Sequence, residues 1–231
     1  MVTDAVSGPQ DAERSATLWF AVLLTLTNGF LDAHTYIARG HVFANVQTAN
    51  VIFSAIRVSD RQFSAALAHV WPLLAFIAGM LLASHIKSGR VEQVVPHSLR
   101  WTIAIQSVVL AAIGFVPASV NHNFVTVPIS FLAAVQIGLF RKIGDLAYLP
   151  VATTGNLMRF MESGYDSLVE KRAEARRPLV VYGTLIVAFA SGALVGAYAT
   201  GAWGVHAIWL PAGFLATTLG LFLVEQREWM R

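Results

Sequence analysis

The sequence predicts an all-α, polytopic membrane protein with about six transmembrane helices, two short polar segments and an inverted internal repeat. Composition is the first observation: 56% of the 231 residues are hydrophobic and only 13% are charged, about half the charged fraction of a typical soluble domain. The second observation is the length of the apolar runs. The third is a polar pattern that occurs twice along the chain.

Six apolar runs approach or exceed the roughly 20 residues that a helix needs to cross a bilayer. They are residues 18–37, 65–86, 101–120, 124–140, 178–198 and 205–224. Runs of this length predict helices, because barrel strands need only about 9–11 residues. We therefore expect a flexible tail over residues 1–16, a single membrane domain over 17–225 and a short tail over 226–231.

Two further apolar segments, 42–58 and 149–161, carry several polar residues and can either span or re-enter the membrane. Lys and Arg accumulate in cytoplasmic loops, so their distribution favours re-entry. If only the six long runs cross, thirteen of the sixteen basic residues lie on one side, and only Arg39, Arg57 and Arg61 lie on the other. If all eight segments cross, the split becomes nine against six, with Arg159 inside a span. The six-span arrangement predicts that both termini are cytoplasmic.

The repeated pattern is a Thr-x-Asn step, at residues 48–50 and again at 154–156. A long apolar run precedes each step and carries a polar residue, Asp32 or Gln136, 16 or 18 positions before the threonine. A run with small residues on one face follows each step. The shared order predicts two duplicated units, about 18–120 and 124–224, which the six-span arrangement makes inverted. Interrupted segments at corresponding positions of inverted halves point to a substrate site near the bilayer midplane.

At these residues the sequence resembles the YoaK-type family of bacterial inner-membrane proteins, also called domain of unknown function 1275. The resemblance rests on Gly29-Phe30-Leu31-Asp32, Val42-Phe43-Ala44-Asn45, Thr48-Ala49-Asn50, Gln136 with Arg141, and Thr153-Thr154-Gly155-Asn156. Ala49 stands where the family usually has glycine, and Ile137 where it usually has asparagine. The resemblance implies a multi-pass protein of the bacterial inner membrane with a transporter-like role and no established substrate.

Asp32 is the most informative single residue, because a carboxylate at the centre of a transmembrane helix costs roughly 2.5–3.5 kcal/mol on insertion scales. It lies five residues before the end of its apolar run, so it is off-centre. Two interpretations are open. Asp32 either binds a proton, a cation or the substrate, or it makes a structural hydrogen bond.

The candidate substrate-binding residues share hydroxyl, amide or carboxylate groups. They are Asp32, Gln47, Thr48, Asn50, Gln136, Thr154 and Asn156. Such groups can bind a neutral or zwitterionic solute, or coordinate a cation through oxygen. The alternative is capping, because Thr and Asn accept hydrogen bonds from helix starts and re-entrant segments must satisfy such groups.

We expect no metal, cofactor or enzymatic activity. The chain has no Cys, and His34 lies two residues after Asp32, so the two side chains point to different sides of a helix. Ser191 has no positioned base that would make it a nucleophile. The basic residues lie in short loops beside the apolar runs, which favours lipid headgroups over nucleic acid as their partners.

The sequence therefore predicts a small-solute permease that works by alternating access around the paired Thr-x-Asn segments. Its expected partners are membrane lipids and a small solute, with a coupling proton or cation, and a homo-oligomer is an open possibility. The alternative is a non-transporting membrane protein that binds a lipid or a partner complex. In that case the polar repeats serve helix packing.

Overall fold

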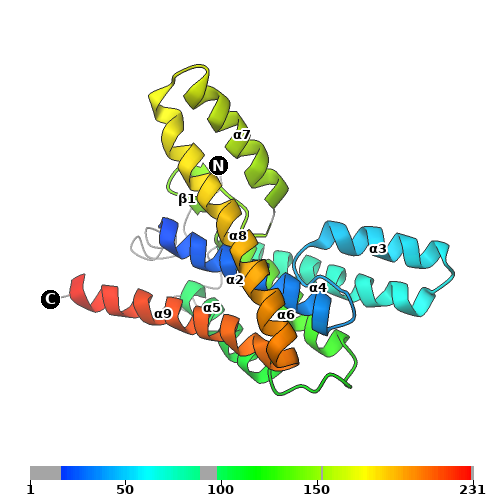
Figure 1. Cartoon of the computed structure of the whole chain (residues 1–231). Helices are drawn as coiled ribbons and strands as arrows, with labels where there is room; N and C mark the ends of the chain where they lie inside the picture. The colour runs from blue at the N-terminus through cyan, green and yellow to red at the C-terminus, as the bar shows by residue number, and fades with distance from the viewer. Residues whose placement is uncertain (1–16, 89–97, 152, 230–231) are drawn as a thin grey trace.

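The computed structural model describes residues 17–88, 98–151 and 153–229, and this part of the chain is all-α apart from one small hairpin, as predicted (Figure 1). The helices are α2 (Leu18–Ala38), α3 (Gln47–Ser59), α4 (Phe63–Lys87), α5 (Ser98–Ile113), α6 (Asn123–Leu139), α7 (Thr153–Leu168), α8 (Arg176–Trp203) and α9 (Trp209–Trp229). Two 3₁₀ turns, η1 (Ala173–Ala175) and η2 (Gly204–Ile208), flank α8. Strands β1 (Lys142–Ile143) and β2 (Leu146–Ala147) form an antiparallel hairpin.

Each of the six predicted apolar runs contains a helix, but several boundaries differ. The run predicted over 101–120 ends as a helix at Ile113, because Pro117 lacks a backbone N–H and cannot continue it. The segment predicted over 149–161 begins later and extends to Leu168. Among the described residues, Phe63–Lys87 and Ala173–Leu221 are long and apolar enough to cross a membrane, while Arg100–Ile113 and Asn123–Leu139 are apolar but shorter.

The small residues of α8 allow it to lie directly on α2. A Cβ atom on Gly192 would collide with the carbonyl oxygen of Leu26, and one on Gly196 would lie 2.7 Å from that of Phe30. From the first contact to the second, the residue numbers increase along both helices, so α2 and α8 are parallel. Gly192 and Gly196 thus allow the backbones of α2 and α8 to approach closely.

The same kind of contact joins α4 to α6. A Cβ atom on Gly79 would collide with the carbonyl oxygen of Phe131, and one on Gly138 would collide with Ala83. These two helices are also parallel. In each predicted unit, the third helix therefore packs on the first helix of the other unit: α4 packs on α6, and α8 packs on α2.

Helices α5 and α9 form a third pair, which is antiparallel. Ser107 Oγ donates to the carbonyl oxygen of Ala212 at 2.8 Å, and Trp209 Nε1 donates to that of Ala111 at 3.1 Å. At the same end of the bundle as Trp209, His206 Nδ1 lies 2.9 Å from the carbonyl oxygen of Gly114. The contacts run in opposite directions along the two helices.

A buried arginine ties the end of α2 to the end of α5. Arg39 is fully buried, and its guanidinium donates to the carbonyl oxygens of Val116 at 2.7 Å and Pro117 at 3.0 Å. These carbonyls follow the last turn of α5, where backbone acceptors lack helical partners. The connection after α2 and the connection after α5 therefore lie at one end of the bundle.

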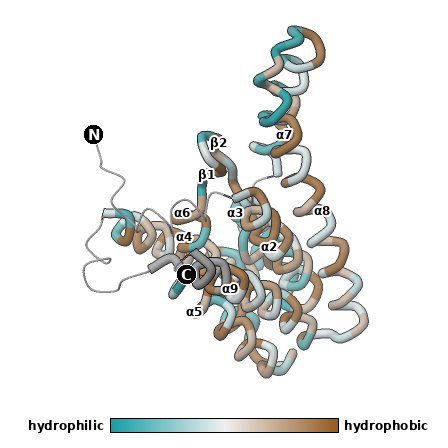
Figure 2. The backbone as a smooth tube through the Cα atoms, turned by 90° about the vertical axis from the view of Figure 1, so that its left-hand side faces the viewer, coloured by the Kyte–Doolittle hydropathy of each residue, from teal (hydrophilic) through white to brown (hydrophobic). Residues whose placement is uncertain are grey.

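Two helical hairpins, α3–α4 and α7–α8, project from the remaining helices in different directions (Figure 1). Hydrophobic residues are spread along both arms of the α7–α8 hairpin, as Figure 2 shows. Leu157, Met158 and Met161 of α7 are exposed, as are Val51 and Ile52 of α3. The hairpins therefore present apolar side chains that the described part of the chain leaves exposed.

We predict that Gly192→Ala destabilises the protein by about 1–3 kcal/mol, because the new methyl group must push α2 and α8 apart. Gly201→Ala is the matched control on the same helix, since a Cβ there meets nothing within 4 Å. It should be neutral or stabilising by up to about 1 kcal/mol. Unfolding of both variants in detergent measures the difference. Equal stability of the two would contradict the close α2–α8 contact.

Candidate functional site

After α2 the chain reverses and runs back along the helix that it has just left. The Tyr36 and Phe43 rings stack with centroids 4.9 Å apart. The backbone N–H of Ala44 then donates to Thr35 Oγ1 at 3.3 Å, and that of Asn45 donates to Asp32 Oδ1 at 2.9 Å. We call residues 39–46 the return loop. Because of it, α3 begins beside the middle of α2 instead of at its end.

A relay of three amide side chains joins the return loop to α2 and α6. Asn45 Nδ2 donates to both the backbone and side-chain oxygens of Asn28, each at 3.3 Å. Asn28 Nδ2 donates in turn to Gln136 Oε1 at 3.0 Å. All three residues are buried. The relay therefore connects the first helices of the two predicted units through the interior of the bundle.

The start of α3 extends this network to α4. Gln47 Nε2 donates to Ser130 Oγ of α6 at 2.8 Å, and Ser130 Oγ donates to the carbonyl oxygen of Pro72 in α4 at 2.8 Å. Asn50 Nδ2 donates to Gln47 Oε1 at 3.1 Å, and Asn50 Oδ1 lies 3.3 Å from His69 Nδ1. The structure thus brings four of the predicted residues into one connected network. They are Asp32, Gln47, Asn50 and Gln136.

The two asparagines of the Thr-x-Asn steps make the same local contact. Asn50 accepts from the backbone N–H of Phe43 at 3.2 Å and donates to its carbonyl oxygen at 2.6 Å. Asn156 does the same with Leu149, at 3.4 and 3.0 Å, also seven residues back. We call these contacts the asparagine clamps. They hold the chain that leads into α3 or α7, and neither is a helix cap, because each acts on a residue outside the helix.

The structure separates the remaining predicted residues from the network. Thr48 and Thr154 are exposed, and among the hydrogen bonds of the described residues none joins Asn156 to the relay. The reason is the β1–β2 hairpin, which follows α6 directly and closes with Tyr148 N–H donating to the carbonyl oxygen of Arg141 at 2.9 Å. In the described residues that follow α6, the chain therefore forms this hairpin and does not run back along α6 as the return loop runs back along α2. Tyr148 is buried there, and burial raises the pKa of its hydroxyl, which stays protonated.

The network contains buried polar atoms that have no partner. Asp32 is 3% exposed, and among the described residues its Oδ2 has no hydrogen-bond partner, although the backbone N–H of Val46 is a further neighbour of the carboxylate. Asn45 Oδ1 is a second free acceptor, while Gln136 Nε2 is a free donor. Because the relay donates in one direction, from Asn45 to Asn28 to Gln136, it leaves acceptors at one end and a donor at the other. The arrangement can receive a proton or a donor group at Asp32 and an acceptor group at Gln136.

Sequence reasoning missed Asn28 and Asn45 as members of the site. Asn28 lies one helical turn before Asp32, so helical spacing alone places both side chains on one face. The role of Asn45 depends on the reversal after α2, for which hydropathy gives no signal. His34, by contrast, lies against α8, where its Nδ1 is 3.0 Å from Thr200 Oγ1. In residues 17–88, 98–151 and 153–229, no three His, Asp or Glu side chains are grouped as metal ligands.

Residues 20–221 match the sequence profile of a family described as "Protein of unknown function (DUF1275)". The chain belongs to the DUF1275 family. It is also 24% identical over 195 residues to the "UPF0700 transmembrane protein YoaK" of Bacillus subtilis (strain 168), an alignment that covers 82% of this chain and 86% of the relative. No solved structure matches the DUF1275 chain. The predicted family is confirmed, and the protein is a membrane protein of that family.

We predict that Asn50→Ala and Asn156→Ala each destabilise the protein by about 1–3 kcal/mol, because each leaves two backbone groups without partners. Hydrogen exchange should separate the two effects. Asn50→Ala should speed exchange of the Phe43 amide and leave the Leu149 amide protected, and Asn156→Ala should do the reverse. Each variant is the control for the other. Unchanged exchange of both amides would contradict the asparagine clamps.

Proposed function

We propose that this DUF1275 protein is a small-solute permease that couples transport to a proton bound at Asp32. The observation that carries the proposal is the free Asp32 Oδ2, which lies inside the network between the return loop, α2 and α6. Ionisable side chains within membrane helices generally belong to ion or substrate pathways or to proton relays. The relay supplies neutral polar groups beside it.

The proposed topology has six crossings of the bacterial inner membrane, with both termini on its cytoplasmic side. It requires α2, α5 and α8 to run outward and α4, α6 and α9 to run inward. The parallel pairs α2–α8 and α4–α6 and the antiparallel pair α5–α9 all agree with these directions. The contact of Arg39 with Val116 also agrees, because both residues then lie at the outer side.

We further propose that the two units are inverted repeats. Support comes from the exchange of third helices, since α8 packs on α2 and α4 packs on α6. The two asparagine clamps add a second correspondence, because each joins residues seven positions apart in its own unit. Inverted repeats allow alternating access, in which one part of the fold rocks against the other around a fixed site.

The proposed substrate is a small neutral or zwitterionic solute that carries both a hydrogen-bond donor and an acceptor. The donor would face Asp32 Oδ2 and Asn45 Oδ1, and the acceptor would face Gln136 Nε2. Proton binding would turn the charge-assisted bond between Asn45 N–H and the carboxylate into a neutral one, which is roughly half as strong. This change loosens the return loop and offers a route to the site from the outer side.

A transport assay in proteoliposomes that contain a pH-sensitive dye tests the proposal. A panel of amino acids, polyols and primary amides should include a solute whose entry moves protons. Asp32→Asn should slow this proton movement about tenfold or more, which corresponds to about 1.4 kcal/mol in activation free energy. The same variant should preserve solute counterflow. The matched control is Asp60→Asn, because Asp60 is exposed beyond α3.

Two outcomes would count against the permease. Proton-coupled transport that survives Asp32→Asn would remove Asp32 from the mechanism. Absence of transport of every solute in the panel, by protein that is folded and inserted, would favour the non-transporting role, in which the network serves packing alone.

A further inference from the structure

Two adjoining hollows lie along the first half of α8. The larger, of about 800 Å³, lies between α7 and α8, and its walls are nearly all apolar. Met161, Gly164 and Tyr165 contribute from α7, and Gly183 and Val187 from α8. The smaller hollow, of about 500 Å³, is lined by Leu18, Ile143, Arg176, Arg177, Val180 and Val181. Val180 lines both hollows, so together they form one groove, which we call the α7–α8 groove.

Glycine keeps the apolar part of the α7–α8 groove open. A Cβ atom on Gly164 would lie 3.5 Å from Leu179 Cδ1, and one on Gly183 would lie 3.0 Å from the Phe160 ring. Any longer side chain at either position would therefore occupy the space between the two helices. The apolar groove extends along the second half of α7, from Phe160 to Leu168 near the tip of the hairpin.

The charged end of the α7–α8 groove carries two arginines, of which, among the described residues, one is in an ion pair and the other is not. Arg177 Nη1 lies 3.1 Å from Asp145 Oδ1, an exposed ion pair. In the part of the chain that the structure describes, Arg176 has no ion pair or side-chain hydrogen bond. Arg176, Val180 and Gly183 share one helical face, at spacings of four and three residues. A free guanidinium thus lies at the end of an apolar channel.

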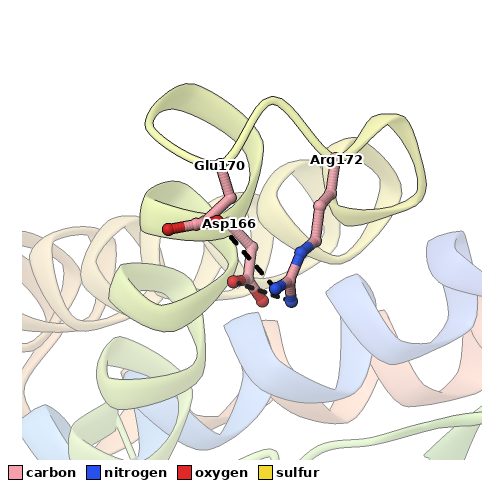
Figure 3. Close-up of polar contacts among 3 residues, drawn as sticks. All are labelled: Asp166, Glu170 and Arg172. Atoms are coloured by element: carbon pink, nitrogen blue, oxygen red, sulfur yellow. Dashed lines mark hydrogen bonds and ion pairs between the residues drawn. The ribbon is translucent and has the colours of Figure 1, made fainter.

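The tip of the hairpin carries two basic residues, Lys171 and Arg172, and Arg172 is arranged differently from Arg176. Arg172 lies 3.4 Å from Asp166 and 4.0 Å from Glu170, so two carboxylates compensate its charge (Figure 3). Arg176 also begins α8, whose macrodipole adds partial positive charge at this end, although its own backbone N–H already donates to the carbonyl oxygen of Ala173. The positive potential is therefore concentrated at the α7–α8 groove and not at the tip.

We propose that the α7–α8 groove binds one anionic phospholipid, with its phosphate at Arg176 and Arg177 and one acyl chain along Val180, Gly183 and Val187. Charge complementarity selects this occupant, because an apolar helix of a second copy would leave the Arg176 guanidinium without an anion, while Arg177 would keep only its exposed pair with Asp145. Basic pockets beside membrane helices on the cytoplasmic side recognise such headgroups. The site does not depend on the permease proposal and lies on a different hairpin from the return loop.

The test measures thermal unfolding of the full chain in detergent with three probes: phosphatidylglycerol, phosphatidylcholine with the same acyl chains, and inorganic phosphate. At about a hundred times its dissociation constant, phosphatidylglycerol should raise the Tm by about 5–10 °C. Phosphatidylcholine and inorganic phosphate should each give less than half of that shift. An equal shift with phosphatidylcholine would overturn the headgroup contact, and an equal shift with inorganic phosphate would overturn the lipid assignment.

Variants separate this site from general attraction of anionic lipid to a basic protein. The double variant Arg176→Gln with Arg177→Gln should lose the phosphatidylglycerol shift. The matched double variant Lys171→Gln with Arg172→Gln removes the same charge at the tip and should keep it. Loss of the shift in both, or in neither, would overturn the proposal.

A third comparison tests the acyl-chain part without changing charge. Gly164→Leu fills the α7–α8 groove and should also lose the shift, while Gly201→Leu, where an added Cβ meets nothing within 4 Å, should keep it. Native mass spectrometry should accordingly count one more bound phosphatidylglycerol on the wild type than on Gly164→Leu. Equal lipid counts would overturn the assignment even if the arginine variants did not fold.

Discussion

The hydrogen bond from the Asn45 backbone to Asp32 is the contact on which the arrangement around α2 depends. The return loop runs beside α2 within an apolar bundle, so its backbone groups cannot rely on water and need internal partners. Thr35, Asn28 and Asn50 supply other partners from neighbouring elements. Polar residues that look anomalous in an apolar sequence thus have a common cause, which is that irregular backbone lies inside the helical bundle.

The network also contains buried polar atoms that the positioning of the return loop does not require. The bond from the return loop to Asp32 forms through Oδ1, and Oδ2 is buried without a hydrogen-bond partner in the described part of the chain. Buried polar atoms without partners are few in native proteins and destabilising, so each calls for an explanation. Together with Gln136 Nε2 at the far end of the relay, Asp32 Oδ2 gives the centre of the bundle a defined chemical polarity. That polarity is the physical basis of the permease proposal.

Much of the fold could be predicted from the sequence, because hydropathy alone located the helices now labelled α2, α4, α5, α6, α8 and α9. The equivalence of Asn50 and Asn156 could also be predicted, since the same step occurs in corresponding places. The position of Asn156 outside the relay could not. It depends on the β1–β2 hairpin between α6 and α7, and two-residue strands give no clear pattern in sequence.

The candidate site shows the same limit more sharply. Thr48 and Thr154 match in sequence as well as the asparagines do, but they lie on exposed faces of α3 and α7. A helix presents residues two positions apart to different sides, so the shared step cannot direct both of its polar side chains into one network. Whether the seven predicted residues bind a solute stays a prediction, and the structure places four of them in the network that has free polar atoms.

The central claim is that the two halves are inverted across the membrane, with α3 entered from one side and α7 from the other. Labelling of single cysteines with a membrane-impermeant thiol reagent tests it most directly, because the chain has no native Cys. Asp60→Cys, just beyond α3, and Glu170→Cys, just beyond α7, are suited to the test, since both side chains are exposed in connections outside the helices. The account predicts that intact cells label position 60, and that position 170 reacts only after the membrane is opened. Labelling of both positions from the same side would contradict it.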